Sequence, residues 1–332
     1  MIPAEETPLR VSTASDPGKG AKHNEDRYRL EAFSLGENNE GAAMFAIVAD
    51  GLGVHRAGEV AAELAVETIA RRVAQSDASQ PTGILQAAII QASQAILARS
   101  ESRREWKGMG STCLCAWLVA DRLYTAGVGN SRLYLLRGRL LQQLNVPQHS
   151  AREQLSVSKP KSKRFRKEAE EDPQRGYLGS KTPVEVDLRL VVKPGDEGRR
   201  AIRNQGLRLL PDDRLLLCTD GLGDALEPHE ILEILGSREL ENVALDLVQF
   251  ALEKGTPNNM TAVVIALPPG RPPLLAQPLN WRRALASTFV VALLVLFGLF
   301  AWWLWQGQLN PMRSPTPTAI NTLTPLSTNT PE

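Results

Sequence analysis

The stretch FAIVADGLG, residues 45–53, places Asp50 directly after an apolar run that predicts a buried strand. Gly51 follows the aspartate and, because it has no side chain, allows a ligand to approach the backbone closely. The same pattern returns in LLLCTDGLGD, residues 215–224, where Asp220 follows a second apolar run. A single Asp-Gly after a strand is typical of an ordinary turn. Two copies of a strand followed by Asp-Gly-Leu-Gly favour a pair of loops that build a site.

A third acidic position precedes both copies in the chain. In HNEDRY, residues 23–28, Glu25 and Asp26 stand at the entrance of a predicted strand. Carboxylates that converge from loops in a partly dry cleft repel one another strongly, so they require cations. Sites rich in hard oxygen ligands suit Mg²⁺ or Mn²⁺. The sequence therefore predicts a divalent metal site.

Apolar periodicity around these positions predicts an α+β fold with helices layered on packed sheets. Two long helices follow the first Asp-Gly, several strands succeed one another in the middle of the chain, and two helices and a strand close the region. Strands are expected at 9–15, 27–33, 43–49, 111–119, 122–128, 131–137, 139–144, 186–192, 214–218 and 260–267, and helices at 56–76, 84–100, 228–235 and 238–253.

The segment TAGVGNSRLYLLR, residues 125–137, predicts a hairpin with a Gly-Asn-Ser turn. Gly129 and Asn130 both tolerate a positive φ, which such turns require. The pattern alone leaves two interpretations open. The turn is either an ordinary hairpin or a metal-site turn in which a carboxylate has been replaced.

Composition excludes some functions. The 38 Lys and Arg residues nearly balance 37 Asp and Glu residues, so no nucleic-acid partner is expected. Cys113, Cys115 and Cys218 lack the second pair or the histidines of a zinc site, and we expect buried free thiols. The charged segment 151–175 is expected to be a solvated loop.

Near the C-terminus, residues 284–305 form an apolar run without a charge. A bilayer core needs about 20 such residues in a helix, so the run predicts a transmembrane helix. Arg282 and Arg283 precede it, which by the positive-inside rule places the chain before it in the cytoplasm. We expect a single-pass protein of the cell membrane. Its expected parts are a globular domain (1–268), a Pro-rich linker (269–283), the membrane helix (284–305) and a disordered Thr/Pro-rich tail on the opposite side (306–332).

Six motifs in order resemble the type 2C (PPM) metal-dependent protein serine/threonine phosphatases of bacteria, over residues 9–268. They are SDPGKGAKHNEDRY (15–28), VADGLGVHRAGEVAA (48–62), GMGSTCLCAWL (108–118), AGVGNSRLYLLRGRLLQQL (126–144), LLLCTDGLGDAL (215–226) and TPNNMTAVVIAL (256–267). The resemblance implies two packed antiparallel β-sheets flanked by helix pairs, a four-layer αββα arrangement.

The resemblance also implies a site with two Mn²⁺ or Mg²⁺ ions. Asp50 would bridge both ions and the Gly51 carbonyl would bind one of them. Asp220 would hold one ion, and Glu25 or Asp26 would support the other. Asp50 and Asp220 would thereby be the catalytic aspartates, because water activated by the two cations attacks phosphorus in line.

Several positions depart from the family pattern. Asn130 stands where the family has an aspartate that helps to hold a further metal. Asn258 replaces an aspartate that is a direct metal ligand, and it would be a weaker, neutral ligand. Ala21 replaces an arginine that grips the substrate phosphate, and Gln148 replaces an aspartate that precedes a histidine. Lys19 or Lys22 could take over the phosphate contact as point charges.

The sequence therefore predicts a membrane-anchored, weakened phosphatase that acts on phosphoserine and phosphothreonine proteins and opposes a cognate kinase. The charge-removing exchanges leave a second interpretation open, a catalytically inactive pseudophosphatase that binds phosphoproteins or relays a signal. A third interpretation assigns the function to the Thr/Pro-rich tail.

Overall fold

The computed structural model describes residues 1–4, 7–21, 23–35, 42–53, 57–148, 176–237, 239–269 and Trp302. The chain divides into two compact units, Met1–Gly270 and Arg271–Glu332. Apart from Trp302, the expected membrane helix and the tail lie outside the described residues, as does the charged segment 151–175. Within the described part of the chain, no helix has the length and apolarity needed to cross a membrane.

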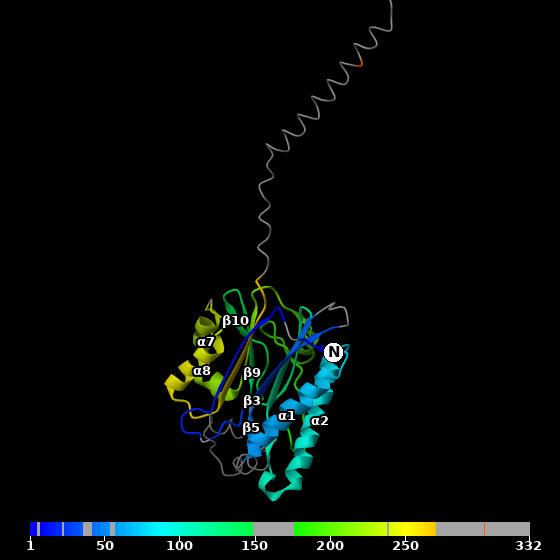
Figure 1. Ribbon diagram of the computed structural model, residues 1–332, viewed down its shortest axis with the longest axis vertical. Helices are drawn as coiled ribbons and strands as arrows, with labels where there is room; N and C mark the ends of the chain where they lie inside the picture. The colour runs from blue at the N-terminus through cyan, green and yellow to red at the C-terminus, as the bar shows by residue number, and fades with distance from the viewer. Residues whose placement is uncertain are drawn as a thin grey trace, which may run out of the picture. The chain divides into compact units, whose positions relative to one another are not determined.

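The first unit contains two antiparallel sheets (Figure 1). The first sheet has the order β1 (Ile2–Pro3), β3 (Arg27–Ser34), β4 (Ala42–Ala49), β7 (Cys113–Val119), β8 (Arg122–Val128) and β11 (Leu207–Arg208). The second has the order β10 (Leu140–Gln143), β9 (Arg132–Arg137), β12 (Arg214–Cys218), β13 (Met260–Ala266) and β2 (Arg10–Asp16). Two short strands, β5 (Gly51–Leu52) and β6 (Gly110–Ser111), pair separately.

Helices cover the outer face of each sheet. These covering helices are α1 (Ala57–Ala74), α2 (Pro81–Ser102), α7 (Pro228–Leu235) and α8 (Val243–Lys254). The described residues also form the short helices η1 (Arg104–Trp106), α5 (Gly198–Arg203) and α6 (Asp220–Ala225). Figure 1 shows α1 and α2 on one side of the two sheets and α7 and α8 on the other. Local sequence defines the helix ends: Pro81 begins α2, and Gly255, with a φ of 87°, ends α8 in the left-handed conformation.

Strands that are buried on both faces explain why the sequence reads as continuous apolar runs. In β4, Phe45 and Ile47 pack in the core with α1 and α2, whereas Val48 packs in the core between the two sheets. In β12, Leu216 packs toward α7 and α8, and Leu215 packs toward the first sheet. The predicted four-layer αββα architecture is therefore confirmed for the described residues.

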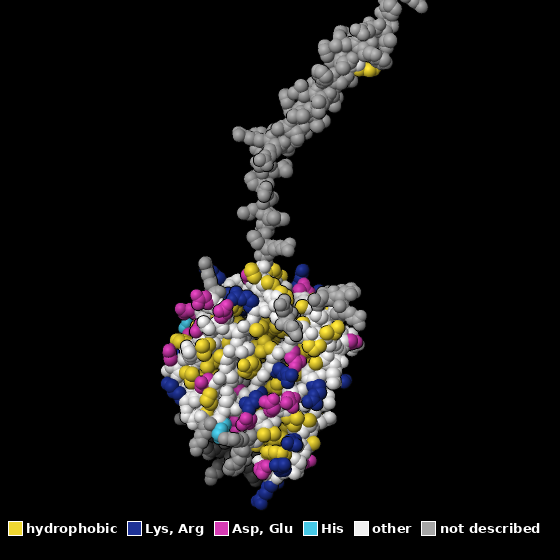
Figure 2. Space-filling view, viewed as in Figure 1, with side chains coloured by type: hydrophobic (Ala, Val, Ile, Leu, Met, Phe, Trp, Pro, Cys, Tyr) yellow, Lys and Arg dark blue, Asp and Glu magenta, His cyan; other side chains and the backbone are white. Residues whose placement is uncertain are grey.

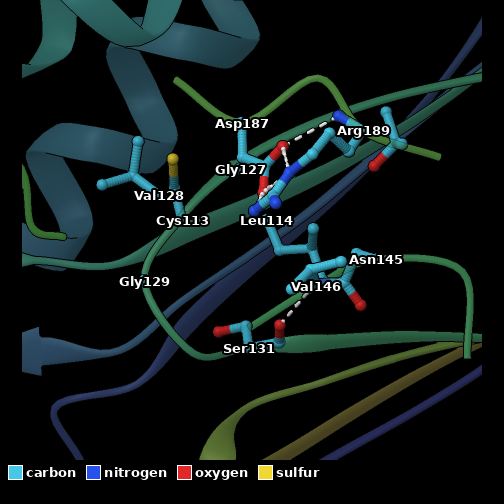
Figure 3. A pocket seen from close by; sticks show the side chains of 11 residues that line it. Cys113, Leu114, Gly127, Val128, Gly129, Ser131, Asn145, Val146, Asp187 and Arg189 are labelled. Carbon is cyan, nitrogen blue, oxygen red and sulfur yellow. Dashed lines mark hydrogen bonds and ion pairs between the residues drawn. The ribbon is translucent and has the colours of Figure 1, made fainter. Parts of the chain in front are cut away.

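The predicted hairpin at 125–137 is wrong. β8 and β9 do not pair with each other, because β8 belongs to the first sheet and β9 to the second. The segment between them, Gly129–Ser131, is instead a corner at which the chain crosses between the sheets. Figure 3 shows this corner, where Asn145 donates a hydrogen bond of 2.8 Å from Nδ2 to the Ser131 carbonyl. The Gly-Asn signal correctly indicated a positive φ at Gly129, but it does not say which strands pair.

Replacing Gly129 with Ala is expected to destabilise the fold by about 2–3 kcal/mol. Gly129 has a φ of +107°, and an added Cβ would lie 2.6 Å from Thr112 Cγ2. The measurement is urea unfolding of wild type and variant. Gly138→Ala is the control, because its φ of +62° is also positive but nothing lies within 4 Å of the new Cβ. That control is expected to cost only about 1 kcal/mol, and equal costs would contradict the contact argument.

Several further elements differ from the sequence-based prediction. Residues 186–192 form no strand: Asp187 makes one bridge to Gly127, and the amides of Leu190 and Val191 donate to separate segments. The helix expected from residue 238 begins at Val243. The sequence pattern did not predict helix α6. The expected buried free thiols are confirmed for all three cysteines.

On the face that Figure 2 shows, Lys and Arg side chains alternate with Asp and Glu side chains. This mixed surface agrees with the near-zero net charge of the sequence.

Candidate active site

Asp50 stands between β4 and β5, and its backbone is fixed from both sides. The Asp50 amide donates to Thr112 Oγ1 at 3.0 Å, and the Thr112 amide donates to the Asp50 carbonyl at 2.8 Å. Ser111 Oγ also donates to the Asp50 carbonyl, at 3.1 Å. The next residue, Gly51, must be glycine, because a Cβ there would lie 2.2 Å from the Gly58 carbonyl oxygen. The Asp-Gly pair is thus a tightly packed junction rather than an open turn.

Asp26 is buried beneath the site, with 3% of its surface exposed. Its Oδ2 accepts hydrogen bonds from Thr219 Oγ1 at 2.7 Å and Thr261 Oγ1 at 2.8 Å. Its Oδ1 is buried and accepts no hydrogen bond from any described residue. The neighbouring group is the carboxyl of Asp50, which can share a hydrogen bond with Asp26 only if one of the two is protonated. When both are ionised, Asp26 Oδ1 needs a cation nearby.

Asp220 is the first residue of α6, which begins directly after β12. One of its carboxylate oxygens, Oδ2, accepts a hydrogen bond of 2.8 Å from Asn130 Nδ2. Asn130, which stands where the family pattern has an aspartate, therefore contacts a predicted metal ligand directly.

An open pocket of about 370 Å³ brings the predicted residues together from separate segments. Its lining consists of Ala21, His23, Glu25, Asp50, Asp220, Pro257, Asn258 and Asn259. Asp26 lies beneath this lining rather than in it. A larger groove of about 680 Å³ between α1 and α2 has a separate lining, and its Glu59 and Glu63 are paired with Arg27.

Burial and mutual repulsion disfavour the ionised carboxylates. Burial, followed by the charges of Asp26, Asp220 and Glu25, raises the pKa of Asp50 well above its usual range. Burial is also the main cause that raises the pKa of Asp26 to about 6, against two threonine hydrogen bonds that lower it. Burial is likewise the largest cause that raises the pKa of Glu25. A cluster of this kind is stable in its ionised form only next to positive charge.

These residues fit divalent cations. The unpaired Asp26 oxygen and the raised pKa values both indicate an excess of negative charge that Mn²⁺ or Mg²⁺ would neutralise. No three acidic, His or Cys side chains in the described part of the chain enclose a metal by themselves. The Gly51 carbonyl, the Asn258 amide oxygen and water would therefore complete the coordination, and water ligands are usual for Mg²⁺.

The sequence profile of the protein phosphatase 2C family matches residues 20–254. The chain belongs to the protein phosphatase 2C family. The serine/threonine phosphatase Stp of Listeria monocytogenes serotype 4b is 32% identical over 262 residues, covering 77% of this chain and 95% of the relative. The serine/threonine protein phosphatase PstP of Mycobacterium tuberculosis H37Rv is 31% identical over 257 residues. That match covers 77% of this chain but 44% of PstP, so the chain spans less than half of that relative.

Solved structures of protein phosphatase 2C relatives share the fold. The crystal structure of PstP/Ppp from M. tuberculosis matches with a TM-score of 0.58 and 28% identity, covering 78% of this chain and 99% of that one. The catalytic domain of PstP in complex with two manganese ions matches with a TM-score of 0.59 and 28% identity, covering 78% and 97%. The two-ion expectation for this family therefore has a direct counterpart in a related structure.

The remaining predicted positions of this protein phosphatase 2C chain are only partly in the pocket. Ala21 lines it, as predicted for the position of the lost arginine. Lys19 does not line it, and Lys22 lies outside the described residues. Gln148 instead supports the corner, because its Oε1 accepts a hydrogen bond from the Gly129 amide at 3.1 Å.

Sequence reasoning missed three residues of the site. His23 lines the pocket, and its charge lowers the pKa of Glu25, which identifies it as a basic group beside the carboxylates. The sequence signal that could have identified His23 is its position two residues before Glu25, a predicted metal ligand. Thr219, which directly follows β12, and Thr261, in the neighbouring strand β13, both donate to Asp26, and only the pairing of β12 with β13 brings them together.

The metal-free chain is expected to lose stability as pH rises from 4 to 7. The folded-state pKa of Asp26 is about 6, above its ordinary 3.8, so the protonated folded form is favoured at low pH. This stabilising contribution is present below pH 4 and is lost as pH rises through about 6. Asp50 acts in the same direction. Urea unfolding in EDTA at several pH values measures the slope.

Asp26→Asn provides the control, because the amide oxygen still accepts from Thr219 and Thr261 but does not titrate. The slope is expected to be shallower in that variant. It is also expected to be shallower for wild type in saturating Mn²⁺, since metal binding requires deprotonated carboxylates. Identical slopes for wild type and Asp26→Asn in EDTA would show that Asp26 titrates normally.

Proposed function

We propose that this chain is a metal-dependent protein serine/threonine phosphatase that hydrolyses phosphoserine and phosphothreonine in proteins. The observation that carries the proposal is the pocket in which Glu25, Asp50 and Asp220 converge above Asp26, whose Oδ1 is buried without a hydrogen bond. The names of the Stp and PstP relatives support the same activity. Asn258 remains in the pocket as a neutral ligand candidate.

Bound Mn²⁺ or Mg²⁺ ions would supply activated water and neutralise the charge of the phosphoryl group. The chain's own part is to hold the ligands in place. Thr219 and Thr261 orient Asp26, the 111–112 segment fixes the Asp50 backbone, and α6 presents Asp220 at its first residue.

A cysteine-based phosphatase mechanism does not fit this chain. All three cysteines are buried in the strands, away from the pocket lining. Burial raises the pKa of Cys218 to about 12, so its thiolate is absent at neutral pH. Hydrolysis by metal-activated water, which requires no covalent phosphoenzyme, fits these residues instead.

The test is phosphate release from phosphothreonine, phosphoserine and phosphotyrosine peptides by the full chain, with Mn²⁺ or with EDTA. We expect release from the first two peptides with Mn²⁺ and none with EDTA. Preference for phosphotyrosine, or release that persists in EDTA, would overturn the proposal. Physiological substrates are proposed to be phosphoproteins made by a kinase that this phosphatase opposes.

A binding-only role is favoured by one pair of observations, the neutral side chains of Asn130 and Asn258 beside Asp220. Under that alternative the folded chain would bind a phosphothreonine peptide without turnover. The names of the relatives support the enzyme instead. Peptide binding without phosphate release at saturating Mn²⁺ would establish the alternative.

We propose further that residues 284–305 anchor the chain in the cell membrane, with the phosphatase unit in the cytoplasm and the tail 306–332 on the other side. The support is the uncharged apolar run preceded by Arg282 and Arg283. Membranes from expressing cells would be washed with alkaline carbonate. Retention of the chain is expected, and release into the wash would refute the anchor.

A further inference from the structure

The corner between β8 and β9 contacts both segments that carry the paired Asp-Gly motifs. Asn130 and Arg132 reach α6, which contains Asp220, and Gly129 and Ser131 lie against Thr112, which binds the backbone of Asp50. Because the chain passes from one sheet to the other at this corner, the corner joins the sheet whose strand β4 precedes Asp50 to the sheet whose strand β12 precedes Asp220.

On the Asp220 side, the corner and Arg132, the first residue of β9, hold α6 at both ends. Asn130 Nδ2 donates to Asp220 Oδ2 at 2.8 Å, at the first residue of the helix. Arg132 donates to the Gly223 carbonyl and forms an ion pair with Asp224, in the last turn. A helix of six residues with two glycines has little stability of its own, so its position depends on tertiary contacts, which are these polar contacts and the packing of buried Leu222 in the core beside α8.

On the Asp50 side, the corner packs on Thr112. Gly129 lies so close that a Cβ would be 2.6 Å from Thr112 Cγ2, and Ser131 Oγ lies 3.5 Å from Thr112 Oγ1. Thr112 in turn binds the amide and the carbonyl of Asp50. The corner therefore contacts Asp50 through Thr112 and contacts Asp220 through the direct hydrogen bond from Asn130.

We infer that this corner sets the position of Asp220 relative to Asp50, and that Asn130 is a positioning residue for the metal ligand Asp220. The inference rests on the proposed metal-dependent function. An asparagine suits this role because its amide donates to a carboxylate, which an ionised aspartate cannot do. Asn130 thus holds Asp220 directly, without a cation between the two side chains.

Partners that hydrogen-bond to a metal ligand affect metal affinity by about 10–100-fold when they are removed. Asn130→Ala is therefore expected to raise the Kd for Mn²⁺ by about 10–100-fold, measured by calorimetric titration of the full chain. Urea unfolding in EDTA, run in parallel, separates this effect from a loss of folding stability.

The matched control is Asn204→Ala. Asn204 Nδ2 also donates to an aspartate, Asp196 Oδ2, at 2.8 Å, but outside the pocket. This variant is expected to bind Mn²⁺ with unchanged Kd. If Asn130→Ala does not fold, Arg132→Lys tests the other end of α6, because a lysine lacks the planar guanidinium whose two separate nitrogens bind Gly223 and Asp224. Arg132→Lys is also expected to weaken Mn²⁺ binding.

An unchanged Kd in Asn130→Ala, or equal weakening in Asn204→Ala, would overturn the inference and leave the proposed function intact. If the wild-type chain binds Mn²⁺ but releases no phosphate, and Asn130→Ala binds Mn²⁺ more weakly than wild type, the inference is upheld and the proposed function is refuted. A wild-type chain that binds no Mn²⁺ would overturn both.

Discussion

Asp50→Asn is expected to lower kcat/KM for a phosphothreonine peptide by roughly 10³-fold at saturating Mn²⁺. Asp50 lines the pocket between Glu25 and Asp220 and lies next to the unpaired oxygen of Asp26, so its charge is central to holding cations there. Cations supply several kcal/mol of charge stabilisation in phosphoryl transfer, and each 1.36 kcal/mol corresponds to a factor of ten in rate.

The same substitution is expected to stabilise the metal-free fold at pH 7. Burial and the neighbouring like charges raise the pKa of the half-buried Asp50, so a neutral amide of the same shape removes an unfavourable charge. Asp121→Asn is the control, since Asp121 is an aspartate outside the pocket that pairs with Arg208. Its activity should equal that of wild type. Full activity in Asp50→Asn would rule out the proposed role of this carboxylate.

Asn258→Asp is expected to tighten Mn²⁺ binding by at least about tenfold and to raise activity at limiting Mn²⁺. Asn258 lines the pocket with Asp220, and its amide is the neutral counterpart of a carboxylate ligand. Affinity at oxygen-ligand sites increases with the number of charged ligands. The added negative charge should also destabilise the metal-free fold, because it lies beside carboxylates that already repel one another. Calorimetric titration with Mn²⁺ measures the change.

The adjacent residue provides a control for charge alone. Asn259 also lines the pocket, but its Nδ2 donates to the Pro17 and His23 carbonyls and its Oδ1 accepts from the Glu25 amide. Asn259→Asp loses both donated hydrogen bonds, so it should destabilise the fold and tighten Mn²⁺ binding much less. Equal tightening by the two variants would mean that Asn258 is not a ligand position.

Most of the fold could be predicted because the apolar pattern of each element matches its burial. β4 and β12 read as continuous apolar runs and are buried on both faces, and the periodic helices α1 and α2 appear where expected. α6 could not be predicted, because the sequence DGLGDA contains two glycines of low helix propensity. It is held by Arg132, which is distant in sequence.

The candidate site was predictable to the level of its acidic residues. Asp50 and Asp220 follow strands and precede glycines, a local pattern that the sequence displays directly. The Asn130 contact with Asp220 could not be predicted, because it depends on β8 and β9 belonging to different sheets. A Gly-Asn turn specifies local dihedral angles and carries no information about the sheet to which the next strand belongs.

The central claim is that this chain retains metal-dependent turnover despite the neutral side chains at positions 130 and 258. The most direct test measures bound Mn²⁺ and phosphate release from a phosphothreonine peptide on the same full-length sample across one Mn²⁺ titration. We predict that phosphate release rises with occupancy and saturates with it. Full Mn²⁺ occupancy without phosphate release, in folded protein, would contradict the claim and leave a phosphoprotein-binding module.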